Sequence, residues 1–404
     1  MNVLTAQLGA RMYYAVPRIL ERSGMLEHFH TDLLGDRGWP KLLGMVPGAN
    51  RSAAVRRMTG RKLSDVPDEK VTAHAALTLG LARKLRRAAS PREVAEAYVW
   101  AGDELCRRAM MAGFGKADAV FVVGSSSRLL FQAAKSQGLM TVMESIIAAP
   151  SVERELLEAE ALEFPEWRDS ATAVSAINFE ELVRSEWELA DCIVCGSEFV
   201  RQSIRLAGGP AERCVVVPYG LDQPVRTVAR VLDESRPLRV LTVGAVGLRK
   251  GSHYVIRAAA KAGRDFNFRM AGPLTVDKSA VLGCPVNLTL LGHVPRAEIG
   301  LLYEWADVFL LPSLCEGSAT VVFEAMAYGL PIVTTPNSGT VVTDEREGFV
   351  VPIRDEAAVV AALQRLRGDA GLYQAMSRAS LNTARRYSFS YYEENLVNAL
   401  KRLR

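Results

Sequence analysis

The chain has 404 residues, of which 49% are hydrophobic and 23% are charged, and its formal net charge at pH 7 is +4. This composition is typical of a soluble globular protein of about two domains and excludes a disordered or fibrous chain. No run of about 18 apolar residues occurs, so we expect no membrane-spanning helix, and the opening residues, MNVLTAQLG, lack the pattern of a signal peptide. The six cysteines are dispersed, which favours a reducing cytoplasm.

Positive charge is concentrated in residues 51–92, which hold eleven Lys and Arg against three acidic residues, a local charge of +8. Apolar residues alternate with these cations. The region is predicted either to contact anionic lipid headgroups at a membrane surface or to form two solvated helix faces. Nucleic acid is not expected as a partner, because the two basic clusters contain no aromatic residues.

The first half of the chain alternates apolar strands with helical stretches. Residues 2–7 are predicted to form a strand, Gly9 a turn and residues 11–22 a helix, and residues 40–113 are largely helical by pattern. More buried strands are expected, at 119–123, 140–144, 192–195 and 214–217. A doubly wound α/β domain of the Rossmann type, residues 1–217, accounts for this order.

A Pro- and Gly-containing segment, residues 218–237, is predicted to be a linker. The strand and helix pattern then restarts, so a second Rossmann-like domain is expected over residues 238–387. Its predicted strands are 239–243, 267–271, 287–291, 308–311 and 332–335, and its predicted helices are 252–262, 297–305, 320–328, 357–367 and 371–386. A last helix is expected at 391–403.

The most informative stretch runs from Pro312 to Ser338 and reads PSLCEGSATVVFEAMAYGLPIVTTPNS. It predicts a loop after a buried strand, then a short helix, so Glu316 lies in the loop and Glu324 in the helix. Both carboxylates are expected to face the crevice beyond the carboxyl ends of the strands, where open α/β sheets bind ligands. The loop residues 317–320 are small, which lets an anion approach their N–H groups at the helix N-terminus.

A second candidate site is the segment VGAVGLRKG, which opens the second domain. It places Gly244 at the end of a strand and the adjacent cations Arg249 and Lys250 before a helix. A Gly-rich turn followed by two cations suits a diphosphate, because the backbone approaches closely and the charges are opposite. The order Arg-Lys-Gly-Ser excludes a Walker loop.

These motifs resemble those of a known family. EGSATVVFEAMAYGLPIV is similar to the E-x7-E motif of retaining glycosyltransferases with the GT-B fold, in family 4, and this resemblance implies two Rossmann-like domains facing a central cleft. VVVPYGLD, VGAVGLRKG, MAGP, LLGHVPRAEI and VFLLPSLCEG continue it in order and spacing. The resemblance covers Cys192 to about Ile353 and is general over the first 190 residues.

The resemblance implies roles for individual residues. Arg249 and Lys250 would neutralise the donor diphosphate, Glu324 would accept the ribose hydroxyls, and Glu316 would bind the transferred sugar or stabilise its anomeric carbon. Glu316, Lys250 and Arg249 are therefore the expected catalytic residues. The loop at His293 and Val294 would hold the base. Other donor-binding residues are expected to be Gly9, Gly244, Gly317, Ser318, Ala319 and Thr320.

The resemblance also implies a reaction. It is the transfer of a sugar, most simply a hexose, from a nucleotide-diphosphate sugar to a glycan or lipid-linked acceptor, in bacterial envelope or exopolysaccharide synthesis. The site would lie in the cytoplasm or at the inner face of the membrane. Retention is ascribed to front-face attack, and no metal or cofactor is expected, since Asp-x-Asp is absent from the sequence. The final helix, residues 388–404, would pack back on the first domain.

The sequence departs from the family pattern at two places. Ala245 stands where an Arg is frequent. No His lies between His74 and His253, so Glu144 and Ser145, at the end of a predicted strand, are the candidates for the acceptor side. Two other functions remain open: a nucleotide-sugar 2-epimerase of the same fold and a non-catalytic protein that binds nucleotide sugars. His28 and His30 alternate as on a strand, but two ligands without a third are usually incidental.

Overall fold

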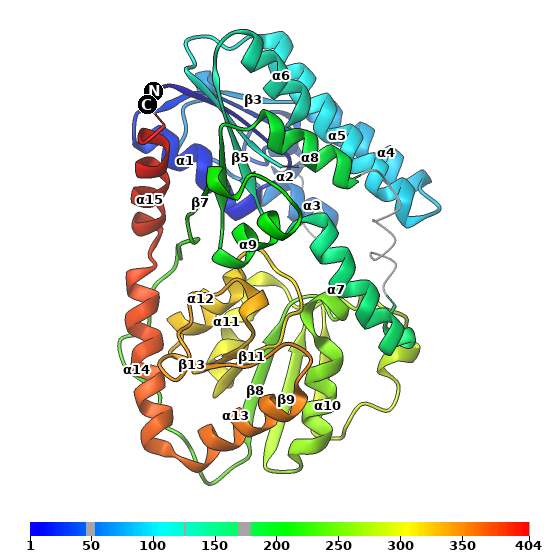
Figure 1. Ribbon diagram of the computed structural model, residues 1–404, viewed down its shortest axis with the longest axis vertical. Coiled ribbons are helices and arrows are strands. Elements are labelled where there is room, and N and C mark those ends of the chain that lie inside the picture. The colour runs from blue at the N-terminus through cyan, green and yellow to red at the C-terminus, as the bar shows by residue number, and fades with distance from the viewer. Residues whose placement is uncertain (46–52, 125–126, 169–178, 404) are drawn as a thin grey trace.

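The computed structural model describes residues 1–45, 53–124, 127–168 and 179–403. Two lobes lie one above the other along the long axis (Figure 1), and each contains one parallel β-sheet covered by helices. Over these residues the first sheet has the strand order β3-β2-β1-β4-β5-β6-β7 and the second the order β10-β9-β8-β11-β12-β13. The expected α/β fold with two Rossmann-like domains is confirmed.

The first sheet contains strands that the apolar pattern predicts and two that it misses. Its strands are β1 Val3–Gln7, β2 Leu26–Thr31, β3 Val71–Ala73, β4 Ala119–Val123, β5 Met140–Ser145, β6 Cys192–Cys195 and β7 Cys214–Val216. The helices around it are α1 Ala15–Arg22, α2 Gly38–Met45, α3 Ala53–Thr59, α4 Ala75–Arg87, α5 Pro91–Ala112, α6 Arg128–Ser136, α8 Phe179–Leu189 and α9 Glu198–Leu206.

Neither β2 nor β3 is among the strands placed in the predicted sheet, although His28 and His30 alternate as on a strand, and β3 interrupts the stretch 40–113 that reads as largely helical. The sequence LEHFHT of β2 carries histidines where an apolar residue would mark a strand, and β3 is a three-residue edge strand with half-exposed side chains. The histidines are nevertheless accommodated: His28 bonds the hydroxyl of Thr72 at 2.8 Å and His30 bonds His74 at 3.2 Å. Within the described ranges, no group of three or more His, Cys, Asp or Glu is arranged to hold a metal ion.

The helix predicted from Arg11 begins at Ala15 instead. Met12, Tyr13 and Tyr14 have φ values of 48°, 52° and 59°, which is the left-handed region that residues with a Cβ atom disfavour. Tyr14 is fully buried and its hydroxyl donates to the carbonyl of Leu33 at 2.9 Å. Burial of this ring holds the turn in a conformation that the helical pattern does not reveal.

The second sheet contains the predicted strands and one more. Its strands are β8 Leu238–Val243, β9 Phe266–Ala271, β10 Leu288–Gly292, β11 Val308–Leu311, β12 Ile332–Thr334 and β13 Gly348–Val350, the last of which was not predicted. The later helices are α10 Ser252–Ala262, α11 Arg296–Trp305, α12 Thr320–Ala327, α13 Glu356–Gly368, α14 Ala370–Arg386 and α15 Phe389–Lys401. The strand β13 has the sequence GFV and lies at the edge of the sheet.

One segment from the range expected for the first domain packs into the second. Helix α7, Pro150–Glu163, and the turn that follows it descend toward the lower lobe (Figure 1), where Leu157 and Trp167 belong to the same apolar core as Phe268. Glu160 is fully buried there and accepts hydrogen bonds from His253 and Arg354, each at 2.7 Å. The carboxylate is thereby compensated by partners from the second domain.

The chain crosses between the lobes again at both ends of the second domain. At this crossing the Leu221 N–H donates to the Tyr387 carbonyl and the Leu221 carbonyl accepts from the Phe389 N–H, each at 2.9 Å. Helix α15 then packs on the first domain, where Tyr392 and Leu396 share a core with Val3. The two crossings are therefore tied together.

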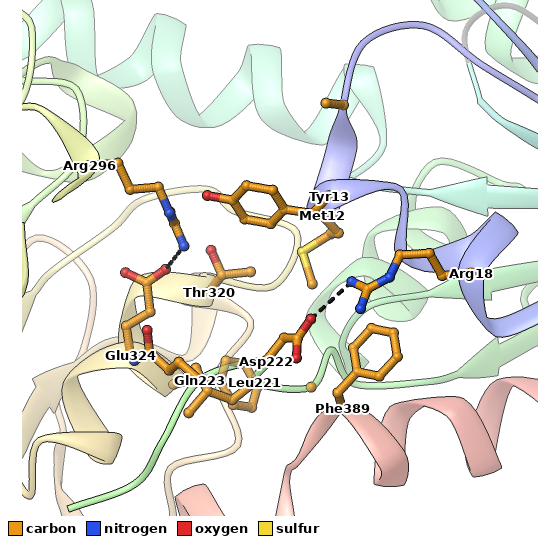
Figure 2. Close-up of a pocket in the computed structure, with 13 residues that line it drawn as sticks. Met12, Tyr13, Arg18, Leu221, Asp222, Gln223, Arg296, Thr320, Glu324 and Phe389 are labelled. Atoms are coloured by element: carbon orange, nitrogen blue, oxygen red, sulfur yellow. Dashed lines mark hydrogen bonds and ion pairs between the residues drawn. The ribbon is translucent and has the colours of Figure 1, made fainter. Parts of the chain in front are cut away.

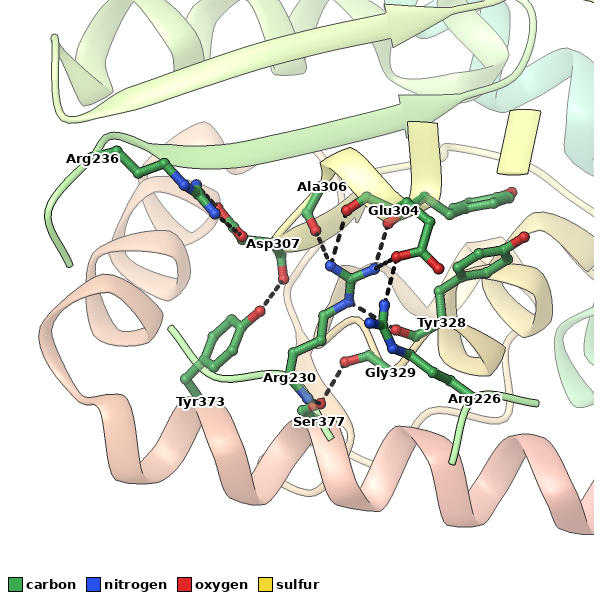
Figure 3. Close-up of polar contacts among 11 residues, drawn as sticks. Arg226, Arg230, Arg236, Glu304, Ala306, Asp307, Tyr328, Gly329, Tyr373 and Ser377 are labelled. Carbon is green, nitrogen blue, oxygen red and sulfur yellow. Dashed lines mark hydrogen bonds and ion pairs between the residues drawn. The ribbon is translucent and has the colours of Figure 1, made fainter. Parts of the chain in front are cut away.

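The linker is fixed to the second domain by Arg230 (Figure 3). The guanidinium donates to the carbonyls of Tyr303, Glu304 and Ala306 at the end of α11 and to that of Tyr328 at the end of α12, at distances of 2.7, 3.2, 2.8 and 2.8 Å. The last carbonyls of a helix have no partner within it, and a cation there also meets the negative end of the helix dipole. Arg230 thus caps two helices at once.

Candidate functional site

Two loops that are distant in the sequence meet at the carboxyl ends of β8 and β11. The Oε1 atom of Glu316 lies 2.8 Å from Nη1 of Arg249 and 2.6 Å from Nζ of Lys250. Glu316 and Lys250 are 8% and 9% exposed. We call these three residues the Glu316 cluster. The structure brings together the residues that the two motifs single out.

Glycines make room for this cluster. Gly244 has a φ of 145°, and a Cβ atom there would lie 3.0 Å from Cε of Lys250, whose side chain passes over it. Gly251 has a φ of 65°, and a Cβ atom would stand 2.0 Å from the carbonyl oxygen of Pro312. Only glycine therefore permits the 244–251 turn to approach the 312–317 loop this closely.

The first domain contacts the Glu316 loop directly. A Cβ atom on Gly317 would lie 1.8 Å from the carbonyl oxygen of Ile146, and the hydroxyl of Ser197 donates to the Gly317 carbonyl at 2.5 Å. Ser318 is buried, and its hydroxyl has no hydrogen-bond partner among the residues that the structure describes. The loop therefore lies at the contact between the two lobes.

A third carboxylate, Glu153, joins the site from the first turn of α7, which packs against the 248–250 turn. Burial raises the pKa of Glu153, and the charge of Glu316 adds to this while Arg249 opposes it. Burial also lowers the pKa of Lys250, against the attraction of Glu316. For Arg249 the attraction of Glu316 and Glu153 outweighs burial, so its pKa is raised. Sequence reasoning missed Glu153, because it lies outside every motif and reaches the site through packing alone.

Glu324 lies on α12, at one side of a cavity of about 650 Å³ between the lobes (Figure 2). Its two carboxylate oxygens accept hydrogen bonds from Arg296 at 3.1 Å and from the Tyr303 hydroxyl at 2.9 Å. Thr320 also lines the cavity, with Met12 and Tyr13 from the first domain opposite. The sequence singled out neither Arg296 nor Tyr13; the first is an exposed helix residue and the second lies in a turn that reads as helix.

Four other residues expected on the donor side, His293, Val294, Ala319 and Gly9, are not among the residues that line this cavity. His293 and Val294 follow β10, with His293 exposed and Val294 half-buried. The N–H of Ala319, expected to face a phosphate, donates to the Ser338 carbonyl at 3.2 Å. Gly9 has a φ of 71°, and its N–H donates to Asp32 at 2.8 Å.

The acceptor-side candidates occupy the end of β5. Glu144 is 2% exposed and its Oε1 accepts a hydrogen bond from the Tyr219 hydroxyl at 3.0 Å, with Nε of Arg11 at 3.7 Å. Ser145 donates to the Ile147 carbonyl at 3.3 Å. Glu144 is therefore engaged by the linker and by the residue before the left-handed turn.

The second domain matches a known protein family. Residues 237–369 match the family model described as glycosyl transferases group 1. Among curated proteins, the amylovoran biosynthesis glycosyltransferase AmsK of Erwinia amylovora is 30% identical over 216 residues, which cover 48% of this chain and 52% of that protein. The putative colanic acid biosynthesis glycosyltransferase WcaL of Salmonella typhimurium is 30% identical over 178 residues, which cover 40% of this chain and 43% of that protein. The chain thus matches about half the length of these relatives.

Solved structures resemble the whole chain. Sucrose-phosphate synthase from Thermosynechococcus elongatus has a TM-score of 0.66 at 16% identity, and the alignment covers 100% of this chain and 99% of that one. The lipopolysaccharide outer core galactosyltransferase WaaB has a TM-score of 0.61 at 15% identity, with 99% of each chain covered. Anabaena HepE in complex with UDP has a TM-score of 0.59 at 14% identity, covering 99% of this chain. The two domains therefore have the GT-B arrangement, and the second carries the sequence pattern of the glycosyl transferases group 1 family.

Proposed function

We propose that this protein is a retaining glycosyltransferase that moves a hexose from a nucleotide-diphosphate sugar to a glycan or lipid-linked acceptor, in bacterial envelope or exopolysaccharide synthesis. The observation that carries the proposal is the Glu316 cluster, in which the buried Lys250, the partly exposed Arg249 and a buried carboxylate meet at the carboxyl edge of the sheet. The family match of this domain and the polysaccharide-related names of the relatives support it. HepE was solved with UDP and glucose, which favours a UDP-sugar as the first donor to test.

The geometry suits departure of a nucleoside diphosphate. As the bond to the sugar breaks, negative charge grows on the leaving phosphate, and Arg249 and Lys250 would stabilise it without a metal ion. Both cations contact Glu316 in the structure, so the donor must compete with this carboxylate for them. Glu316 would then turn to the transferred sugar, where positive charge develops at the anomeric carbon. In front-face attack, the departing phosphate accepts the proton of the acceptor hydroxyl.

The proposal is tested by incubating the full chain with UDP-, GDP- and ADP-hexoses, with and without glycan or lipid-linked acceptors. We expect one donor to give a new glycoside with the donor's anomeric configuration, in the presence of EDTA. Free nucleotide with an epimerised sugar and no glycoside would indicate an epimerase. Binding without any turnover, including hydrolysis, would indicate a non-catalytic protein. Full activity of Glu316→Gln would remove that residue from the mechanism.

We further propose that the acceptor is reached at an anionic membrane surface. Among the described residues of the basic region, Arg83, Lys84, Arg86 and Arg87 lie exposed at the end of α4, and Leu79 on the same helix is 60% exposed. Cations beside an exposed apolar side chain suit a headgroup layer. Residues 51 and 52 of this region lie outside the described residues. No helix in the described ranges is long and apolar enough to cross a membrane.

Co-sedimentation with vesicles of phosphatidylcholine and phosphatidylglycerol tests this. A triple change of Arg83, Arg86 and Arg87 to Ser should reduce binding, and salt should reduce the binding of the wild-type protein by screening. The matched control changes three exposed cations of the second domain, Arg264, Lys278 and Arg378. Equal binding of both variants would contradict a membrane contact through α4.

A further inference from the structure

Tyr13 is held out toward the cavity by a strained turn. The three consecutive residues Met12, Tyr13 and Tyr14 adopt left-handed backbone, and Tyr13 is 49% exposed although it lies between the lobes. Such backbone persists only where the surroundings impose it, and it gathers at functional sites. Here the buried Tyr14 anchors the turn through Leu33. The turn therefore presents an aromatic face of the first domain to the cavity.

Arg296 of the second domain covers that aromatic face (Figure 2). Its guanidinium carbon lies 5.1 Å from the centroid of the Tyr13 ring, and its Nη2 donates to Oε1 of Glu324 at 3.1 Å. Its side chain is 65% exposed. A single planar group with N–H donors thus contacts an aromatic ring on one lobe and a carboxylate on the other.

A nucleoside would make the same two contacts. Its base is planar and stacks on aromatic side chains, and its vicinal hydroxyls are donors that suit a carboxylate. The guanidinium occupies the face of the ring at stacking distance, so base and guanidinium cannot lie on that face of Tyr13 together. The cavity of about 650 Å³ beside them has the volume of a ligand site.

We propose that Tyr13 stacks on the base of the donor nucleotide, and that in the absence of donor Arg296 occupies the position that the nucleoside takes when it binds. The base replaces the guanidinium on Tyr13, and the ribose replaces it on Oε1 of Glu324. This inference rests on the proposed function, because it takes the donor to be a nucleotide sugar.

The displacement is compatible with the contacts that remain. Arg296 projects largely into solvent, so its guanidinium is hydrated when it leaves, and an exposed ion pair or cation–π contact is weak. Glu324 keeps the hydrogen bond from the Tyr303 hydroxyl at 2.9 Å, which leaves its carboxylate oriented. Binding of the donor thus exchanges one set of contacts between the lobes for another.

The test is calorimetric titration of the full chain with UDP, GDP, ADP and inorganic pyrophosphate. For the nucleotide that binds the wild-type protein, Tyr13→Ala should weaken affinity about tenfold and Tyr13→Phe about twofold or less, since stacking requires only the ring. Affinity for pyrophosphate, which needs Arg249 and Lys250, should be unchanged. Arg296→Ala should bind the nucleotide about threefold more tightly, because it removes the competitor.

Two control variants match the changed residues. Tyr98→Ala removes a tyrosine of α5 that is 52% exposed. Arg365→Ala removes an arginine that, like Arg296, pairs with a carboxylate, Glu345 at 2.9 Å, and covers a ring, that of Phe349 at 4.6 Å. Neither residue lines the cavity, so both variants should bind nucleotide as the wild-type protein does.

Each outcome has a distinct meaning. Equal nucleotide affinity of wild type and Tyr13→Ala would overturn the inference and leave the proposed function intact. Equal losses for nucleotide and pyrophosphate in Tyr13→Ala would also overturn it, because the change would then act through the turn. A tenfold loss in Arg296→Ala would show that Arg296 holds the ligand. If pyrophosphate binds and no nucleoside diphosphate does, the proposed donor itself is wrong.

Discussion

The change of Arg230 to Ala should destabilise the second domain by about 3 kcal/mol. The guanidinium, 11% exposed, donates to four main-chain carbonyls at the ends of α11 and α12 (Figure 3). A hydrogen bond to a charged group contributes about 1.5–3 kcal/mol. The sum is reduced because burial of the cation is unfavourable, as the lowered pKa of Arg230 shows, and because water reaches some of the freed carbonyls. A net loss of about 3 kcal/mol follows.

Hydrogen exchange measured by mass spectrometry, with urea unfolding as a second measure, would test this value. Arg226→Ala is the matched control, because this neighbouring linker arginine makes one exposed ion pair with Glu304 at 2.6 Å and should contribute less than about 1 kcal/mol. Exchange should accelerate at the carboxyl ends of α11 and α12 in Arg230→Ala alone. Equal effects of the two variants, or a loss below about 1 kcal/mol for Arg230→Ala, would refute the capping argument.

Three other predictions concern charge. Lys250→Ala should lower kcat by about 10²–10³ in the donor-hydrolysis or transfer assay, because a cation at the leaving group is lost, with partial recovery in Lys250→Arg; an unchanged kcat would contradict it. Glu153→Gln should tighten pyrophosphate binding at neutral pH about threefold by removing a negative charge beside Arg249. This gain should fade as the pH falls and the raised-pKa carboxyl of the wild type becomes protonated; exposed Glu158→Gln on the same helix is the control. Burial and the neighbouring His28 and His74 lower the pKa of His30 to about 3. Because the unfolded chain protonates this imidazole more readily than the folded one does, the free energy of unfolding should fall as the pH drops below 6.5. The expected loss is about 2 kcal/mol at pH 5. His30→Asn should flatten this dependence in urea unfolding, and an unaltered pH profile would count against it.

The sequence predicts the strands that lie deep in the sheets, because burial on both faces requires continuous apolar runs such as those of β4, β8 and β11. It misses β2, β3 and β13 for local reasons. The strand β2 buries His30, which pairs with His74, a residue 44 positions away. The other two, VTA and GFV, are three-residue strands at the edges of their sheets. The left-handed turn at Met12–Tyr14 is missed because its cause is the burial of one tyrosine, which the helical period does not encode.

The part of the candidate site that the sequence predicts is the part whose residues lie in recognisable loops at strand ends. The Glu316 cluster follows from two loops at adjacent strand ends, since β8 and β11 are neighbours in the sheet. Glu153 and Tyr13 come from elements whose position depends on how the lobes pack. Arg296 reaches Glu324 across 28 residues as an exposed side chain. Contacts of this kind depend on the tertiary arrangement and leave no local pattern.

The docking of α7 on the lower lobe determines how this chain can be divided. The lobes are interleaved in the sequence, since residues 150–167 complete the core of one lobe while the flanking strands β5 and β6 belong to the other. A fragment starting at residue 238 would expose the apolar surface that Leu157 and Trp167 cover, and would lose the hydrogen bond between Glu160 and His253. A chimera that exchanges the second domain for that of a relative must therefore exchange α7 as well. Otherwise an apolar surface stays exposed on the second domain and on α7.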